Sequence, residues 1–251
     1  MRTAAVTLII VALLLAYPAI ARGSSGSFTT AVATASTEAA SPDRLGFTLH
    51  SDAWASLEGT WLRAIRLPGL EPPLHVGASL DLPLLLWVRT GAPETFRARA
   101  RAALTVWQAG PLELVTDAAL GLGLQDSVLN TSLGLELELA VTPILRFGTW
   151  YVGPRLEWRQ ALATYVHHGQ VVQDAFQDLP TARSPRDGWV AFPLTRLAWG
   201  LVAGGEVAEG WQVFGGLGAV TTFTEPGVGA FDAMMLGVWP FYAEVGVSVR
   251  L

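Results

Sequence analysis

The sequence contains no cysteine and little charge. None of its 251 residues is Cys, and 15% are Asp, Glu, Lys or Arg, whereas soluble globular domains carry about 25%. The missing cysteines exclude disulfides and an anchor on a lipid-modified cysteine. The net charge of −5 and the scatter of the basic residues, which form no basic tail, argue against a nucleic acid partner.

Long apolar runs are confined to the beginning of the chain. Arg2 supplies a positive start, residues 3–17 form an apolar core, and Ala19-Ile20-Ala21 is a small-x-small cleavage site. This pattern predicts a signal peptide over residues 1–21, cleaved after Ala21. An uncleaved anchor is the alternative, but a spanning helix needs about 20 apolar residues and this core is shorter.

Residues 22–44 are rich in Ser, Thr, Ala and Gly and cannot bury a core, which predicts a flexible leader. From residue 45 to residue 251, apolar and polar residues alternate between turn residues, which predicts one all-β domain. The final segment is the clearest, because every second residue from Ala243 to Leu251 is apolar and the residues between them are polar or glycine.

Eight segments of about ten residues or more, enough to cross a membrane at a tilt, show this alternation. They are residues 75–89, 95–107, 111–125, 131–142, 146–162, 189–208, 211–223 and 239–251. Tight turns are predicted at 108–111, 142–144 and 208–210, and longer connections at 126–130, 166–188 and 224–238.

Residues 45–66 allow two interpretations. They can form a further hairpin, which gives ten strands. They can also form an amphipathic helix that begins after Asp52, because Trp54, Leu57, Trp61 and Ile65 have helical spacing. The strand count is therefore eight to ten.

Charged residues recur on one face of the strands. Arg97, Arg99 and Arg101 alternate with alanines, and a lipid-facing arginine at the midplane costs about 2–4 kcal/mol. The arginines are therefore predicted to face an enclosed interior and the alanines to face lipid. The predicted lumen-facing polar network consists of Asp81, Arg97, Arg99, Arg101, Glu113, Asp117, Glu136, Glu138, Arg155, Glu157, Arg159, Arg196 and Glu244.

These interior charges are nearly balanced in sign, which predicts ion pairs, because an unpaired buried charge is costly. Arg101 is expected opposite or diagonal to Asp117, with Glu138 on the next strand. Two interpretations of the interior remain: a packed polar core, or a narrow anion-selective pore. A barrel of ten strands favours the pore. Aromatic residues near strand ends fit membrane interfaces: Trp87, Trp107, Trp150, Trp158, Trp189, Trp211, Trp239 and Phe241.

The last strand resembles the C-terminal assembly signal of bacterial outer-membrane barrels. A polar residue, a glycine two positions later and two apolar residues around the penultimate position correspond to Glu244, Gly246, Val249 and Leu251. The family usually ends in Phe or Trp, whereas this chain ends in Leu251. The resemblance implies an antiparallel up-and-down transmembrane β-barrel of 8–10 strands in the outer membrane of a Gram-negative-type bacterium. Its partners would be outer-membrane lipids and the outer-membrane assembly machinery, with the oligomeric state open.

The predicted function is a structural or narrow pore-like barrel, without enzymatic activity, cofactor or metal. One alternative is a rim enzyme acting on lipid or peptide, since His167 and His168 open the longest loop and acids and a serine follow. These later residues are Asp174, Asp178, Ser184 and Asp187. Adjacent histidines on a strand are expected to point apart, which disfavours a metal site there.

A soluble exported ligand-binding barrel is the other alternative, against which the apolar faces at 82–86 and 133–141 argue. The glycine-rich runs 200–205 and 215–218 lack the Lys-Ser/Thr pair and the following helix of a phosphate loop. They are therefore predicted to be bends within strands.

Overall fold

The computed structural model describes residues 43–51, 55–69, 72–83, 94–126, 130–177, 187–224 and 241–251. The predicted signal peptide, the leader up to residue 42, Trp87 and Trp239 lie outside these residues. The first described strand begins at Asp43, two residues before the start of the β domain predicted from the sequence.

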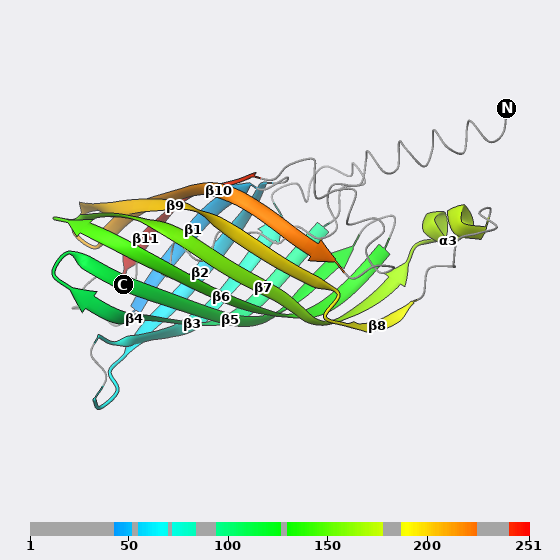
Figure 1. The fold of residues 1–251 in the computed structure, drawn as a ribbon, viewed down its shortest axis with the longest axis horizontal. Helices are drawn as coiled ribbons and strands as arrows, with labels where there is room; N and C mark the ends of the chain where they lie inside the picture. Colours follow the sequence, from blue (N-terminus) through cyan, green and yellow to red (C-terminus); the bar gives the residue numbers. More distant parts are fainter. Residues whose placement is uncertain are drawn as a thin grey trace.

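Ten long antiparallel strands close into a barrel (Figure 1). They are β1 (Asp43–Ser51), β2 (Ala55–Ile65), β3 (Leu74–Pro83), β4 (Glu94–Ala109), β5 (Leu112–Asp126), β6 (Asn130–Phe147), β7 (Trp150–His168), β9 (Leu194–Ala208), β10 (Trp211–Thr224) and β11 (Phe241–Arg250). Each pairs with its neighbours in the barrel, and β1 pairs with β11 to complete the ring. The fold is the predicted all-β up-and-down barrel, at the upper end of the predicted strand count.

Two smaller elements extend one end of the barrel. Strand β8 (Gly188–Ala191) pairs with the last part of β7, and helix α3 (Gln170–Gln177) lies between β7 and β8. We call this the loop end (Figure 1). The opposite end, the turn end, carries the tight turns at residues 110–111, 148–149 and 209–210. None of the helices described in the structure is long and apolar enough to cross a membrane.

Residues 43–51 and 55–65 form the antiparallel pair β1–β2, so the alternative of an amphipathic helix is wrong. The register pairs Phe47 with Gly59 and Leu45 with Trp61. Trp61 is exposed on the outer surface, whereas the next residue, Leu62, is buried inside. Alternation with period two therefore decides the burial, although the large apolar residues also happened to fit a helical period.

The turn predicted at residues 142–144 is also wrong. Strand β6 continues through Pro143, which pairs in register with Leu114 of β5. Thr142 and Ile144 are buried, and Pro143 faces outward. The turn falls at Gly148, whose φ of 62° suits glycine. Proline therefore sits inside this long strand instead of ending it.

The segment predicted as one strand over residues 189–208 is divided. Phe192 adopts a φ of 51°, which is uncommon for a residue with a side chain. Pro193 follows and has no backbone N–H to donate to a strand ladder. Strand β8 ends before this pair and β9 begins after it, so β8 belongs to the loop end and β9 to the barrel wall.

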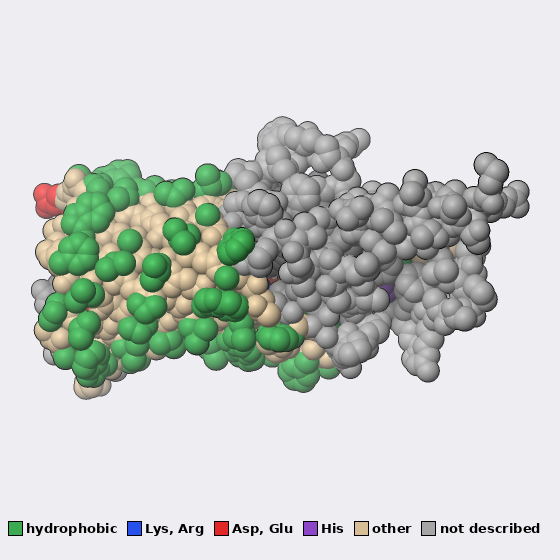
Figure 2. Space-filling view, turned by 45° about the horizontal axis from the view of Figure 1, so that its top comes forward, with side chains coloured by type: hydrophobic (Ala, Val, Ile, Leu, Met, Phe, Trp, Pro, Cys, Tyr) green, Lys and Arg blue, Asp and Glu red, His purple; other side chains and the backbone are tan. Residues whose placement is uncertain are grey.

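The outer surface of the barrel is apolar. Leu120, Leu122, Leu139, Leu156 and Leu201 are each more than two-fifths exposed, and each lies between inward-facing residues of its strand. Figure 2 shows hydrophobic side chains spread over the outer wall, with acidic atoms at its end. Such a surface is suited to lipid, and closure gives each described wall strand a neighbour on both sides.

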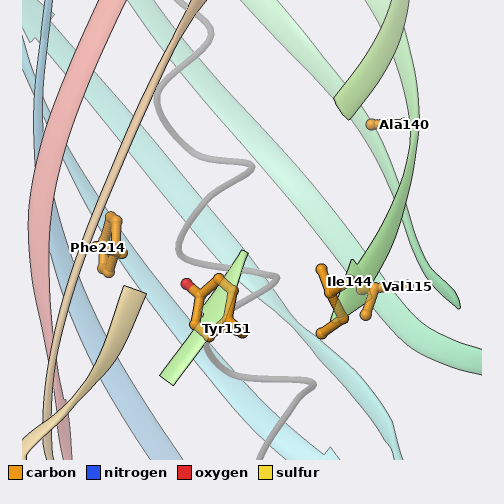
Figure 3. Packing of buried hydrophobic residues seen from close by; sticks show 5 residues of the cluster. All are labelled: Val115, Ala140, Ile144, Tyr151 and Phe214. Atoms are coloured by element: carbon orange, nitrogen blue, oxygen red, sulfur yellow. The ribbon is translucent and has the colours of Figure 1, made fainter. Parts of the chain in front are cut away.

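Part of the interior is apolar, which the sequence analysis did not anticipate. Val115, Ala140, Ile144, Tyr151 and Phe214 form a buried cluster contributed by β5, β6, β7 and β10 (Figure 3). Glycines on neighbouring strands leave room for its rings. A Cβ atom on Gly204 would lie 2.5 Å from the Tyr151 hydroxyl, and one on Gly246 would lie 2.3 Å from the Phe214 ring.

We expect Gly204→Ala to lower the free energy of unfolding by about 1–3 kcal/mol, because the new methyl group overpacks the interior beside Tyr151. Ala203→Val is the matched control, since Ala203 faces outward on the same strand, and should have little effect. Urea unfolding of both variants in lipid vesicles, followed by tryptophan fluorescence, measures the difference. Equal destabilisation by the two substitutions would contradict this packing.

Candidate functional site

The interior of the barrel carries the predicted charges. Twelve of the thirteen residues of the predicted network are buried, and the side chain of the remaining one, Glu136, is 19% exposed. Arg97, Arg99 and Arg101 of β4 are buried, whereas Ala98 and Ala100 between them are exposed on the outer surface. One face of β4 therefore points into the enclosed interior, and the other forms part of the outer surface.

Glu138 of β6 is the centre of the charged interior. Its Oε2 atom accepts hydrogen bonds from Arg99 at 2.9 Å and from Arg159 at 2.7 Å, and its Oε1 atom accepts one from Arg101 at 2.8 Å. Arg101 also donates to Asp117 at 2.9 Å. One carboxylate thus holds guanidinium groups from β4 and β7.

The same arginines also reach the strands on the other side of β4. Arg99 donates to Glu58 of β2 at 3.2 Å and lies 3.5 Å from Asp81 of β3. Arg97 lies 3.3 Å from Glu136 and 3.7 Å from Asp81. The arginine row of β4 therefore joins β2 and β3 to β6.

A second run of ion pairs continues from β7 to β11. Arg159 pairs with Glu157 at 3.3 Å, and Glu157 pairs with Arg155. Arg155 reaches Glu244 of β11 at 2.8 Å, and its guanidinium carbon lies 5.4 Å from the centre of the Tyr242 ring. Together, the two runs form what we call the ion-pair belt, which extends around the interior from β2 to β11.

Inward-facing glycines allow these long side chains to pass over intervening strands. A Cβ atom on Gly121 of β5 would lie 2.4 Å from the Arg99 side chain, which crosses β5 to reach Glu138. A Cβ atom on Gly216 of β10 would lie 2.6 Å from the Glu244 carboxylate. Glycine is therefore required at these positions for space, because no larger residue fits beneath the charges.

Sequence reasoning missed several interior polar residues. Arg44, His50, Glu58, His75 and Gln212 are buried. The first three lie in or next to the segment whose structure was left open between hairpin and helix. Once the segment is taken as a hairpin, alternation with Leu49 and Leu57 assigns His50 and Glu58 to the interior.

The residues of the predicted assembly signal occupy different places. Glu244 pairs with Arg155 in the belt, and Gly246 provides the space for Phe214. Val249 pairs in register with Leu45 and with Trp211, and Leu251 is exposed at the turn end. Recognition of this segment by an assembly machinery remains a prediction.

At the loop end, His167 and His168 share one partner, although adjacent strand residues were expected to point apart. The Nδ1 atom of His167 lies 2.5 Å from Oδ2 of Asp187, and Nδ1 of His168 lies 2.8 Å from Oδ1. The His168 amide also donates to Asp187 at 2.9 Å. Among the other predicted rim residues, Asp174 lies on α3, while Asp178 and Ser184 fall outside the described residues.

The aromatic residues expected at membrane interfaces are largely on the outer surface. Trp107, Trp150, Trp189, Trp211 and Phe241 are exposed, and Trp158 is half-buried. Tyr165 meets Trp189 edge to face at the loop end, with ring centres 5.6 Å apart. Exposed aromatic residues near both ends of the wall are typical of a membrane-spanning barrel.

A closed antiparallel barrel with an apolar outer surface and a charged interior is the architecture of transmembrane β-barrel proteins. The chain matches no protein-family model and no curated protein. Among solved structures, it is similar to the β domain of the Bordetella autotransporter BrkA, with 15% identity, 84% of this chain and 99% of that chain covered, and a TM-score of 0.41. It is also similar to the KdgM porin, with 7% identity, 83% of this chain and 99% of that chain covered, and a TM-score of 0.31.

Glu138→Gln should lower the free energy of unfolding by about 3–5 kcal/mol, because it leaves three buried arginines around a neutral side chain. The control is Leu139→Ala, which changes the outward-facing neighbour and should cost much less. Urea unfolding in vesicles measures both variants. A loss no larger than that of Leu139→Ala would show that Glu138 does not hold the belt together.

The carboxyl group of Asp187 should titrate at unusually low pH. Hydrogen bonds from the His168 amide and from both imidazoles lower the pKa of Asp187 from 3.8 to about 2. The contacts with the two histidines are therefore complete above pH 3.8 and are lost as the pH falls through about 2. Carbon-13 NMR of aspartate-labelled protein measures the midpoint, and Asp187→Asn identifies the resonance. A midpoint near 3.8 would contradict the assignment.

Proposed function

We propose that the protein is a non-enzymatic, structural β-barrel of the outer membrane with a closed interior. The burial of the ion-pair belt carries this proposal. Side chains of Glu58, Asp117, Arg155 and Glu157 are no more than 1% exposed. In an open water-filled channel, charges on the wall would be hydrated, whereas here protein atoms cover them and opposite charges neutralise them.

The apolar cluster supports the same conclusion. Val115, Ile144, Tyr151 and Phe214 are each no more than 3% exposed and point into the barrel (Figure 3). Apolar constrictions exclude ions from pores by dewetting. The interior therefore has two obstacles of opposite chemistry, the belt and this cluster. Ten strands alone favoured a narrow pore, and the packing of the side chains favours a closed barrel.

The location in an outer membrane rests on the arrangement of the wall. Each described wall strand pairs with a strand on both sides, exposed outer side chains are apolar, and short turns lie at one end. Bacterial outer-membrane barrels place short turns in the periplasm and longer connections outside. The turn end would thus face the periplasm and the loop end the exterior, with outer-membrane lipids and the assembly machinery as partners.

The side chains at the loop end of the barrel do not favour an enzymatic function over the structural role. In the described part of the loop end, His167 and His168 both contact the carboxylate of Asp187. A hydrolase of the acyl-transfer type requires a nucleophile beside its base. The shared carboxylate instead ties the end of β7 to the start of β8.

Planar-bilayer recording tests the closed interior. The purified wild-type protein should give no steady channel current at any applied voltage, because the belt and the apolar cluster both obstruct the barrel. The same sample must show heat-modifiable migration on a gel, which establishes that the silent protein is a folded barrel. A reconstituted porin in the same lipid serves as the positive control. Steady open-channel current from the folded protein would overturn the proposal.

A further inference from the structure

We propose that His50, Glu58 and Asp81 form a binding site inside the barrel for a divalent transition-metal ion such as zinc. The three residues lie on the adjacent strands β1, β2 and β3 and are all buried. This inference goes beyond the proposed structural role and does not depend on whether the barrel conducts ions.

The three ligand atoms lie close to one another. One ligand atom from each residue lies within 4.8 Å of the other two. Nε2 of His50 lies 3.3 Å from Oδ1 of Asp81. Two ligands of one tetrahedral zinc ion, each bonded at about 2.0–2.1 Å, are about 3.3 Å apart, which matches this separation.

The donor set also suits this chemistry. One imidazole nitrogen and two carboxylate oxygens are ordinary zinc ligands, and three protein ligands leave a fourth position for water. Thr60 donates a hydrogen bond to Oε1 of Glu58 at 2.9 Å. The Ser56 hydroxyl lies 3.1 Å from both ring nitrogens of His50. Such partners orient metal ligands from the second layer.

The neighbouring arginines that contact these two carboxylates also have partners on β6. Arg97 lies 3.3 Å from Glu136 but 3.7 Å from Asp81. Arg99 lies 2.9 Å from Glu138, compared with 3.2 Å from Glu58 and 3.5 Å from Asp81. Each guanidinium therefore has a closer partner on β6 as well, and a metal ion at this site would share Glu58 with the Nη2 atom of Arg99.

The charges of the belt leave an acidic excess that a cation can offset. Among the described residues, the belt contains the carboxylates Glu58, Asp81, Asp117, Glu136, Glu138, Glu157 and Glu244 and the arginines Arg97, Arg99, Arg101, Arg155 and Arg159, and the buried Arg196 lies opposite Arg159 in register. Seven carboxylates thus face six guanidinium groups. A metal ion whose bound water ionises near neutral pH, as on zinc, would bring the total to zero. A proton on His50 is the competing way to do so.

The site lies toward the loop end. His50 is the residue before the end of β1, and Asp81 comes two residues before the end of β3. The site therefore lies on the loop-end side of Tyr151 and Phe214 of the apolar cluster.

Metal titration of the complete folded barrel tests the site. Protein in detergent is stripped with EDTA, and zinc binding is then measured by calorimetry and cobalt binding by the visible absorption of tetrahedral Co²⁺. The wild type should bind one equivalent. Ser56→Ala should weaken binding by about 10–100-fold, and His50→Ala or Asp81→Asn by more, because each removes a ligand. The matched control His167→Ala at the rim should leave binding unchanged.

Several results would overturn the site. They are the absence of a stoichiometric site in the wild type, binding that survives in His50→Ala, or binding that disappears in His167→Ala. In the first case the proton on His50 is the better account of the charge. Heat-modifiable migration checks that each variant forms a barrel, and His50→Gln replaces His50→Ala if the latter does not fold. The wild-type stoichiometry and cobalt spectrum require no variant.

Discussion

The pairing of β1 with β11 is the interaction on which the rest of this structure depends. It runs from Arg44 opposite Arg250 to Ser51 opposite Ala243 and joins the first and last strands of the sheet. Without it, two long edges of unpaired amide and carbonyl groups would face lipid, where each such group costs several kcal/mol. Closure also creates the enclosed interior. The buried arginines, the apolar cluster and the proposed three-residue metal site all depend on the return of the sheet to its own first strand.

Once the interior is enclosed, its chemistry follows from the cost of burying charge. Guanidinium and carboxylate groups leave water together, and a shared partner such as Glu138 satisfies three arginines at once. Inward-facing glycines also allow these charges to pair. Gly121 and Gly216 leave room for charged side chains to reach strands that are not their neighbours. The glycine content of this chain therefore serves packing inside the barrel as much as bending of the wall.

The described interior is layered along the barrel. The ion-pair belt lies toward the loop end from the apolar cluster, and a smaller set of ion pairs, Glu113 with Arg146 and Glu206 with Arg250, lies at the turn end. A polar layer and an apolar layer in series close the barrel more firmly than either does alone, because a hydrated ion must lose water at one and compete with fixed charges at the other. This layered packing of the interior supports the proposed structural role of the barrel.

The sequence by itself determined the fold class and which residues of β4 to β7 face inward, because a period of two assigns each side chain to lipid or to the interior without knowledge of its partners. It left residues 45–66 undecided, since Leu57, Trp61 and Ile65 fit two periods in so short a segment. It placed a turn at Pro143, where the strand continues. Only the tertiary structure decided that Glu138 meets three arginines, that His167 and His168 converge on Asp187, and that His50, Glu58 and Asp81 come together from three strands. These contacts depend on register and closure, and no spacing along one strand contains that information.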